Sequence, residues 1–190
     1  MIISFNQAKV FVKHFCVCYS ASTLERVCCF FFEKMEEKRM KTLGYYNGKF
    51  GELDEMSIPM NDRVCWFGDG VYDAGLSRNY KIFALNEHID RLFNSAGLLD
   101  IKVPVTKAEL ADLLQEMVNK MDTGNLFVYY QVTRGTGMRN HVFPEGKANL
   151  WIMLKPAEIA DGTKPIKLIT AEDTRFFHCN IKTLNLIPSV

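Results

Sequence analysis

A regular apolar period between Thr106 and Gly124 is the feature that most constrains what this chain can fold into. Thr106, followed three residues later by Glu109, has the pattern of a helix capping box. Apolar side chains then recur at intervals of three and four residues, at Leu110, Leu113, Leu114, Met117, Val118 and Met121. Gly124 is the expected end of this helix. A helix with one apolar face needs another layer to cover that face, so the sequence predicts a packed globular domain.

A second amphipathic helix is predicted over residues 86–99, because its apolar residues follow the i, i+3, i+4, i+7 pattern. They are Ile89, Leu92, Phe93 and Ala96. Asn86 is the expected N-cap. We expect Glu87 and His88 to lie on the solvent-facing surface of this helix.

The strand signals surround these helices. Asn47-Gly48 is a strong hairpin turn signal inside 42–51, and 70–85 contains two further extended runs joined around 77–79. Aromatic and β-branched residues mark 125–135 and 149–156 as central strands. Strands and helices in this order predict an α+β domain over residues 40–157.

Residues 1–39 differ in composition from the rest and are expected to lie outside the fold. They hold four of the six cysteines, Cys16, Cys18, Cys28 and Cys29. The Glu36-Glu37 pair, encodable as a purine-rich run, precedes Met40 at the distance of a bacterial ribosome-binding site. We therefore hypothesise that Met40 is the natural start, and retention of Met1 in the natural protein would refute this.

A linker is predicted over 158–164, where Gly162 and Pro165 interrupt a segment without periodicity. A new strand is expected at 166–173. Residues 165–190 would then begin a second domain that is truncated at Val190.

Composition excludes several classes of function. A net charge of +1 gives no general attraction to nucleic acid or membrane surfaces, and the longest apolar run in the leader, 27–32, is far below the roughly 20 residues of a membrane span. The start of the chain alternates in polarity and does not resemble a secretory signal. The cysteine spacings are not those of zinc sites. We expect a cytoplasmic protein without a metal site, whose partner is a small molecule.

Lys182 is the candidate reactive amine. Its apolar neighbours are Ile181, Leu184, Leu186 and Ile187, and loss of solvent disfavours the charged form of an amine. A lysine that forms a Schiff base must be able to lose its charge in this way. The alternative is an ordinary solvated lysine near the end of the chain.

Arg139 and His141 are a candidate carboxylate site, since alternate side chains of an extended loop point the same way. The alternative is a solvated basic loop. The "FGDG" stretch (67–70) lacks the spacing and the lysine of nucleotide-binding loops, and predicts a tight turn before a strand. Taken alone, Arg91 is interpreted as a salt-bridge residue of its helix.

Four motifs together carry a family resemblance: "FGDGVYD" (67–73), "NEHIDRL" (86–92), "QVTRGTGMRNHVFPEG" (131–146) and "HCNIKTLNLIPSV" (178–190). In this order and spacing, the sequence resembles the fold-type IV pyridoxal-phosphate enzymes. The similarity runs from about Thr42 to Val190 and is greatest to the D-amino-acid aminotransferase branch. It implies the N-terminal domain of that fold and the first part of its cofactor-binding domain.

The resemblance also implies roles for individual residues. Lys182 matches the lysine that holds pyridoxal 5'-phosphate as a Schiff base and transfers the substrate proton, and Arg91 matches the arginine that binds the cofactor phosphate. Tyr72 matches an active-site tyrosine near the substrate carboxylate. Arg139 and His141 match the pair that holds the α-carboxylate, which in the family comes from the partner subunit, so a homodimer is implied.

The implied reaction is transamination between a D-amino acid, such as alanine or glutamate, and a 2-oxo acid. Branched-chain aminotransferases and aminodeoxychorismate lyases share the fold but lack the Arg-x-His pair, which favours the D-specific interpretation. Family members continue for roughly another hundred residues that supply the carboxylate paired with the pyridine nitrogen. A non-catalytic fragment is therefore the alternative from another class, and we expect the chain alone to be poorly active or inactive.

Overall fold

The computed structural model describes residues 41–160, 162–170, 172–173, 178–187 and 190. All of them belong to one compact unit that spans Glu37–Val190. The predicted leader, 1–39, and the hypothetical start at Met40 lie outside the described residues.

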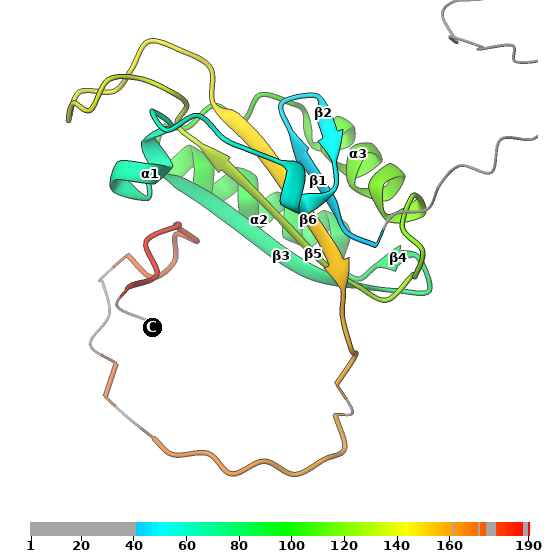
Figure 1. Cartoon of the computed structure of the whole chain (residues 1–190). Coiled ribbons are helices and arrows are strands. Elements are labelled where there is room, and N and C mark those ends of the chain that lie inside the picture. Colours follow the sequence, from blue (N-terminus) through cyan, green and yellow to red (C-terminus); the bar gives the residue numbers. More distant parts are fainter. Residues whose placement is uncertain (1–40, 161, 171, 174–177, 188–189) are drawn as a thin grey trace, which may run out of the picture. The chain divides into compact units, whose positions relative to one another are not determined.

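A six-stranded antiparallel sheet forms the centre of this unit (Figure 1). Its strands, in spatial order, are β2 (Lys49–Gly51), β1 (Leu43–Tyr46), β6 (Asn149–Pro156), β5 (Leu126–Thr133), β3 (Gly70–Arg78) and β4 (Lys81–Ile82). The two strands with the most apolar sequences, β5 and β6, are central, as predicted.

Two long helices, α2 (Leu85–Leu98) and α3 (Lys107–Asn119), cover one face of the sheet (Figure 1). Alternate residues of the central strands are buried against them, Val128, Tyr130, Leu150 and Ile152 among them. Two short helices complete the unit, the 3-10 helix η1 (Leu53–Glu55) and α1 (Arg63–Phe67). The architecture confirms the α+β prediction.

The capping box of α3 is present as predicted. The Thr106 side chain accepts a hydrogen bond from the Glu109 backbone N–H, and the Glu109 side chain accepts one from the Thr106 N–H. The helix ends at Asn119 and not at Gly124. Gly124 instead lies close to the turn before β4. Any side chain at this position would collide with that turn, because a Cβ would lie 2.3 Å from the backbone nitrogen of Tyr80.

The prediction that Asn86 caps α2 is wrong. The helix begins at Leu85, its N-cap is Ala84 in the left-handed region (φ 48°), and no side chain caps it. The chain leaves the short strand β4 through this tight turn, which moves the first helical residue ahead of Asn86. A side chain already inside the helix no longer has the N-cap position.

Both predicted hairpins are present. Asn47 and Gly48 take positive φ values of 45° and 93° between β1 and β2. The second turn is centred on Asn79 and Tyr80 (φ 51° and 63°), slightly later than predicted.

The strand expected at 166–173 is absent from the described residues of that stretch. Its apolar side chains are exposed, and Ile166, Leu168 and Ile169 each have at least 78% of their surface accessible. A strand needs a neighbouring strand to pair with, and none lies against this segment in the described chain. The division into domains at 157 and 165 remains a prediction.

Within the described ranges, no helix is both long and apolar enough to cross a membrane. Nor do the described side chains form a group of three or more metal-ligand residues.

Candidate active site

The backbone of Lys182 lies along the free edge of β3. The Tyr72 N–H donates to the Lys182 carbonyl oxygen at 3.1 Å, and the Leu184 N–H donates to the Gly70 carbonyl at 3.1 Å. The Lys182 N–H donates to the Ser95 hydroxyl of α2 at 3.2 Å. This edge is open to Lys182 because β4 pairs with β3 only at the other end of that strand, at Ser77 and Arg78.

Two glycines of the "FGDG" turn make room for the residues that follow Lys182. A Cβ at Gly70 would lie 2.6 Å from both the Leu184 side chain and the Val132 carbonyl oxygen. A Cβ at Gly68, which has a φ of 60°, would lie 2.6 Å from the Asn185 side chain. The tight turn predicted from the sequence is present, and it also accommodates the chain around Lys182, named here the lysine segment (residues 181–185).

The Lys182 amine lies 4.0 Å from the centre of the Tyr72 ring, over its face. Tyr72 in turn stacks on Tyr129 of β5, with 5.5 Å between ring centroids. The structure thus brings Lys182 and Tyr72 together, as the resemblance implies.

The apolar enclosure expected for Lys182 is only partly present. Its side chain is half-buried, and Leu186 and Ile187 are 42% and 86% exposed. The aromatic face of Tyr72 is the main neighbour of the amine.

Arg91 is held by a buried carboxylate that the sequence analysis did not identify. Its Nε donates to Asp73 Oδ2 at 2.7 Å and its Nη2 to Asp73 Oδ1 at 2.8 Å, while Asp73 has no exposed surface. His88 Nδ1 lies 2.8 Å from the same Oδ1. His88 is therefore turned toward the sheet, which corrects its predicted surface position.

Charge and burial compete at Asp73. Burial alone raises the pKa of this carboxyl, but the hydrogen bonds from Arg91 and His88 outweigh it and hold the pKa below its ordinary value. The hydrogen bonding between Arg91 and Asp73 also raises the pKa of Arg91. Asp73 and Arg91 are therefore both held in their charged forms.

Tyr72 and Asp73 are neighbours on β3, so their side chains lie on opposite faces of the sheet. Asp73 and Arg91 lie on the helix-covered face, and Tyr72 lies with the Lys182 amine on the other face. The lysine segment is hydrogen-bonded to the edge of β3 through the Tyr72 backbone N–H. It is also bonded to α2 through the hydroxyl of Ser95, which is one helical turn beyond Arg91. The edge of the single strand β3 thus separates the Lys182 amine from the Arg91 guanidinium.

Arg139 and His141 lie on the loop between β5 and β6. Both are exposed, and both contact the Phe67 ring at the end of α1, at 5.3 Å for the Arg139 guanidinium and 5.9 Å between the two rings of Phe67 and His141. Both side chains meet one ring, and their convergence on a carboxylate remains a prediction. Phe67 is the first residue of the "FGDG" turn, and within the described residues neither side chain makes a hydrogen bond, ion pair or ring contact with Lys182 or Tyr72.

A buried arginine, also missed from the sequence, supports this loop. Arg63 is 4% exposed and donates to Asp69 Oδ2 at 2.6 Å and to the Asn140 carbonyl at 2.6 Å. Arg134 donates to the same Asp69 at 2.9 Å. One carboxylate thus connects both arginines to the start of β3.

The burial of Asp73 could have been predicted from the sequence. Asp73 lies two residues after Val71, which faces the core, so its carboxylate had to be buried and therefore paired. The partner could not be identified, because Arg91 is 18 residues away on another element.

Arg91 and Lys182 have the chemistry to hold a ligand with a phosphate and a carbonyl group. The Arg91 side chain is 49% exposed, and its Nη1 has no hydrogen-bond partner among the described residues. Within the same part of the chain, no carboxylate forms an ion pair with the Lys182 amine. Among the described residues, Arg91 Nη1 and the Lys182 amine thus remain without a charged partner.

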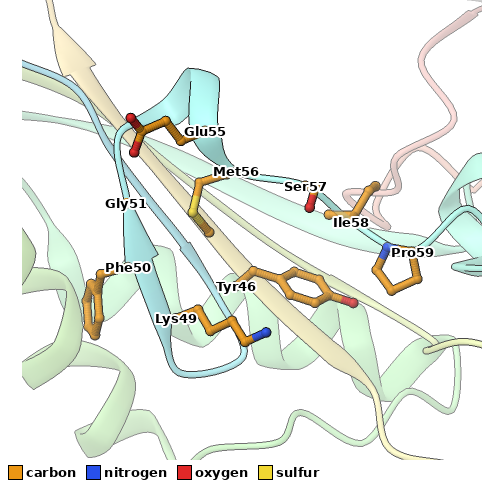
Figure 2. A pocket seen from close by; sticks show the side chains of 9 residues that line it. All are labelled: Tyr46, Lys49, Phe50, Gly51, Glu55, Met56, Ser57, Ile58 and Pro59. Atoms are coloured by element: carbon orange, nitrogen blue, oxygen red, sulfur yellow. The ribbon is translucent and has the colours of Figure 1, made fainter.

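A separate pocket of about 500 Å³ lies beside the β1–β2 hairpin. Figure 2 shows it between the hairpin and the segment that follows η1, lined by residues that include Tyr46, Phe50, Met56 and Pro59. Burial first, and the charge of Asp62 second, raise the pKa of Tyr46 to about 12. None of the candidate residues lines this pocket.

Comparison with known proteins identifies a family. The family model described as "Amino-transferase class IV" matches residues 70–190. D-alanine aminotransferase from Listeria monocytogenes is 40% identical over 152 residues, covering 76% of this chain and 52% of that protein. The enzyme of the same name from Bacillus licheniformis is 36% identical over 156 residues, covering 80% and 54%. The chain thus spans about half the length of these relatives.

Solved structures of similar fold include two branched-chain amino acid aminotransferases. The T.th. enzyme, complexed with N-(5'-phosphopyridoxyl)-L-glutamate, has a TM-score of 0.57 at 20% identity, covering 63% of this chain and 42% of that one. The Escherichia coli enzyme has a TM-score of 0.57 at 17% identity, covering 62% and 42%. At these identities the likeness concerns the fold.

Proposed function

Since this chain belongs to the amino-transferase class IV family, we propose that it carries the lysine-bearing part of a pyridoxal-phosphate-dependent aminotransferase site. The proposed reaction exchanges an amino group between a D-amino acid, such as alanine or glutamate, and a 2-oxo acid. The observation that carries the proposal is the position of the Lys182 amine, 4.0 Å from the Tyr72 ring centre, on a segment bonded to β3 and α2.

In this proposal Lys182 would hold pyridoxal 5'-phosphate covalently and, once the substrate amine has displaced it from the cofactor, its free amine would move the proton at the substrate Cα. Pyridoxal 5'-phosphate, when bound, supplies the electron sink for this chemistry. The Tyr72 ring under the amine fixes the direction from which the proton arrives. Arg91 binds the cofactor phosphate with the donors that Asp73 leaves free.

Arg139 and His141 would hold the substrate α-carboxylate. Since neither side chain contacts Lys182 or Tyr72 among the described residues, we infer that they serve the site of a second copy in a homodimer. Lys182 delivers its proton to one face of the substrate only, so the side on which the carboxylate is held decides the hand of the amino acid. Curated relatives named D-alanine aminotransferase favour the D-specific outcome.

We also infer a cytoplasmic setting, in which an exposed thiol such as Cys65 stays reduced.

The first test is an absorbance spectrum of the 190-residue chain with pyridoxal 5'-phosphate, beside a Lys182→Ala control. We expect the visible band of a Schiff base only when Lys182 is present, and bleaching of that band by D-alanine. Absence of a Lys182-dependent band would overturn the proposal for this chain and favour a non-catalytic fragment.

The second test compares amino donors. Faster bleaching with D-alanine than with L-leucine is expected. The reverse order would favour the branched-chain class, whose members share the fold.

A further inference from the structure

Asp73 is a carboxylate without exposed surface at a core-facing position of β3. It accepts two hydrogen bonds from Arg91, at 2.7 and 2.8 Å, in the parallel geometry that matches a guanidinium to a carboxylate. A buried charge is expensive unless its partners are in place. The position of Asp73 therefore calls for an explanation beyond packing.

Ala74, His88 and Gly75 complete the surroundings of the Asp73 carboxylate, and the Ala74 backbone N–H donates to Asp73 Oδ1 at 2.7 Å. His88 Nδ1 lies 2.8 Å from Asp73 Oδ1 and 3.1 Å from Arg91 Nη2, and in its Nδ1–H tautomer the ring donates to the carboxylate. Gly75, the next residue on the same face of β3, leaves room for the ring, since a Cβ there would lie 3.4 Å from His88 Nε2. Asp73 Oδ1 thus faces Arg91 Nη2, His88 Nδ1 and the Ala74 N–H together, so the carboxylate cannot turn away from Arg91 without losing the other two contacts as well.

We propose that Asp73 is a positioning residue for phosphate recognition: it holds the Arg91 guanidinium by Nε and Nη2 so that Nη1 is directed at the phosphate of the cofactor. This inference rests on the proposed function. An arginine side chain has many rotamers, and one that is fixed in advance loses less freedom when its anion binds. Asp73 would therefore raise affinity for the phosphate group without touching it.

The test compares two aldehydes that differ only in the phosphate, pyridoxal 5'-phosphate and pyridoxal. The dissociation constant of each is measured from the Lys182-dependent absorbance band, and the ratio of the two constants reports the contribution of the phosphate. In Asp73→Asn we expect this preference to fall roughly tenfold, while pyridoxal binding is unchanged.

Three further variants make the result specific. Asp90→Asn is the matched control: Asp90 is next to Arg91 in sequence, but it is exposed and pairs with Lys107, so the preference should not change. Asp73→Glu keeps the charge and should restore part of the preference. In an Arg91→Met background, Asp73→Asn should have no additional effect, because Asp73 acts only through Arg91.

An unchanged preference in Asp73→Asn, including equal loss of both affinities, would overturn the assignment and leave Asp73 a purely structural role. A further loss in the Arg91→Met background would overturn it as well. If the unmodified chain forms no Lys182-dependent band with either aldehyde, the proposed function fails first, and the role of Asp73 fails with it.

Discussion

Tyr129 occupies the centre of the aromatic row on the open face of the sheet, between Tyr72 and Trp151. Its hydroxyl donates to Gln131 Oε1 at 2.7 Å. Burial first, and the neighbouring Tyr72 second, raise the pKa of Tyr129 from 10.0 to about 12. The folded protein therefore keeps this phenol protonated at a pH where the unfolded chain has lost the proton.

The stability contribution of this shift is complete below about pH 10 and is lost as the pH rises through about 12. We expect the free energy of unfolding to fall more steeply over this range in the unmodified chain than in Tyr129→Phe. At pH 8 the variant should be less stable by about 1 kcal/mol, the usual cost of one lost hydrogen bond. Urea unfolding at a series of pH values measures both effects, and parallel curves would contradict the prediction.

At the residue level, the resemblance identified Lys182, Tyr72 and Arg91, and the structure gives these residues defined neighbours. It did not identify Asp73 or Arg63, whose importance depends on partners distant in sequence. The spacing of a motif reveals which residues recur together. It does not reveal which buried charged residues form ion pairs with each other.

Among the structural elements, α2 and α3 offer a direct comparison of a true cap with a false one. Thr106→Ala should cost about 0.5–2 kcal/mol, since it removes the side chain that accepts from the Glu109 N–H. Asn86→Ala should be neutral or slightly stabilising, because Asn86 lies inside α2 and is exposed. Denaturation midpoints of the two variants measure the difference, and equal losses would contradict the assignment of the caps.

The loop from Arg134 to Ala148 depends on Arg63, which donates to the carbonyl oxygens of Asn140 at 2.6 Å and Val142 at 3.3 Å. Arg63→Met should cost roughly 1–3 kcal/mol, the range for lost hydrogen bonds of a charged group. Amide hydrogen exchange around His141 should become faster as the loop loses its anchor. Lys120→Met, which removes an exposed ion pair with Glu116, is the control and should leave the loop unchanged. Unchanged exchange in Arg63→Met would show that the loop is held by other contacts.

Elements whose signals are local were predicted well, and elements that need distant partners were not. The capping box of α3 and the Asn47-Gly48 turn are determined by residues within a few positions of one another. The stretch 166–173 has strand-like composition but no pairing partner in the described chain, so it forms no strand. Likewise, nothing near Ala84 in the sequence predicts the left-handed turn that displaced the start of α2.

For the whole molecule, the proposed exchange of Arg139 and His141 between two copies predicts complementation. Lys182→Ala lacks the amine, and Arg139→Met lacks the carboxylate site, so each variant alone should show no D-alanine-dependent bleaching. Equal mixing should restore about one site in four, because half of the dimers are mixed and each contains one intact site. The amplitude of bleaching after mixing measures this, and no recovery would place the pair and the lysine in one subunit.

The order of elements and the α+β class followed from the sequence because the helices and central strands have clear periods. The joining of Lys182 to β3 did not, since it links residues more than one hundred positions apart. Such a pairing depends on which edge of the sheet is left free. Here β4 is short and pairs with only the last two residues of β3, so the start of β3 is free to bind the lysine segment.

The attachment of the lysine segment has a consequence for the energetics of local opening. The segment is joined to the sheet and to α2 by few hydrogen bonds, two of them with the edge of β3. Segments with few anchoring bonds open at a lower free-energy cost than the core beneath them. The amine of Lys182 should therefore be able to leave and regain its place over Tyr72 while β5 and β6 remain protected from exchange. In the proposed function, the amine that forms and releases a covalent bond is thus carried by a segment with few anchoring hydrogen bonds.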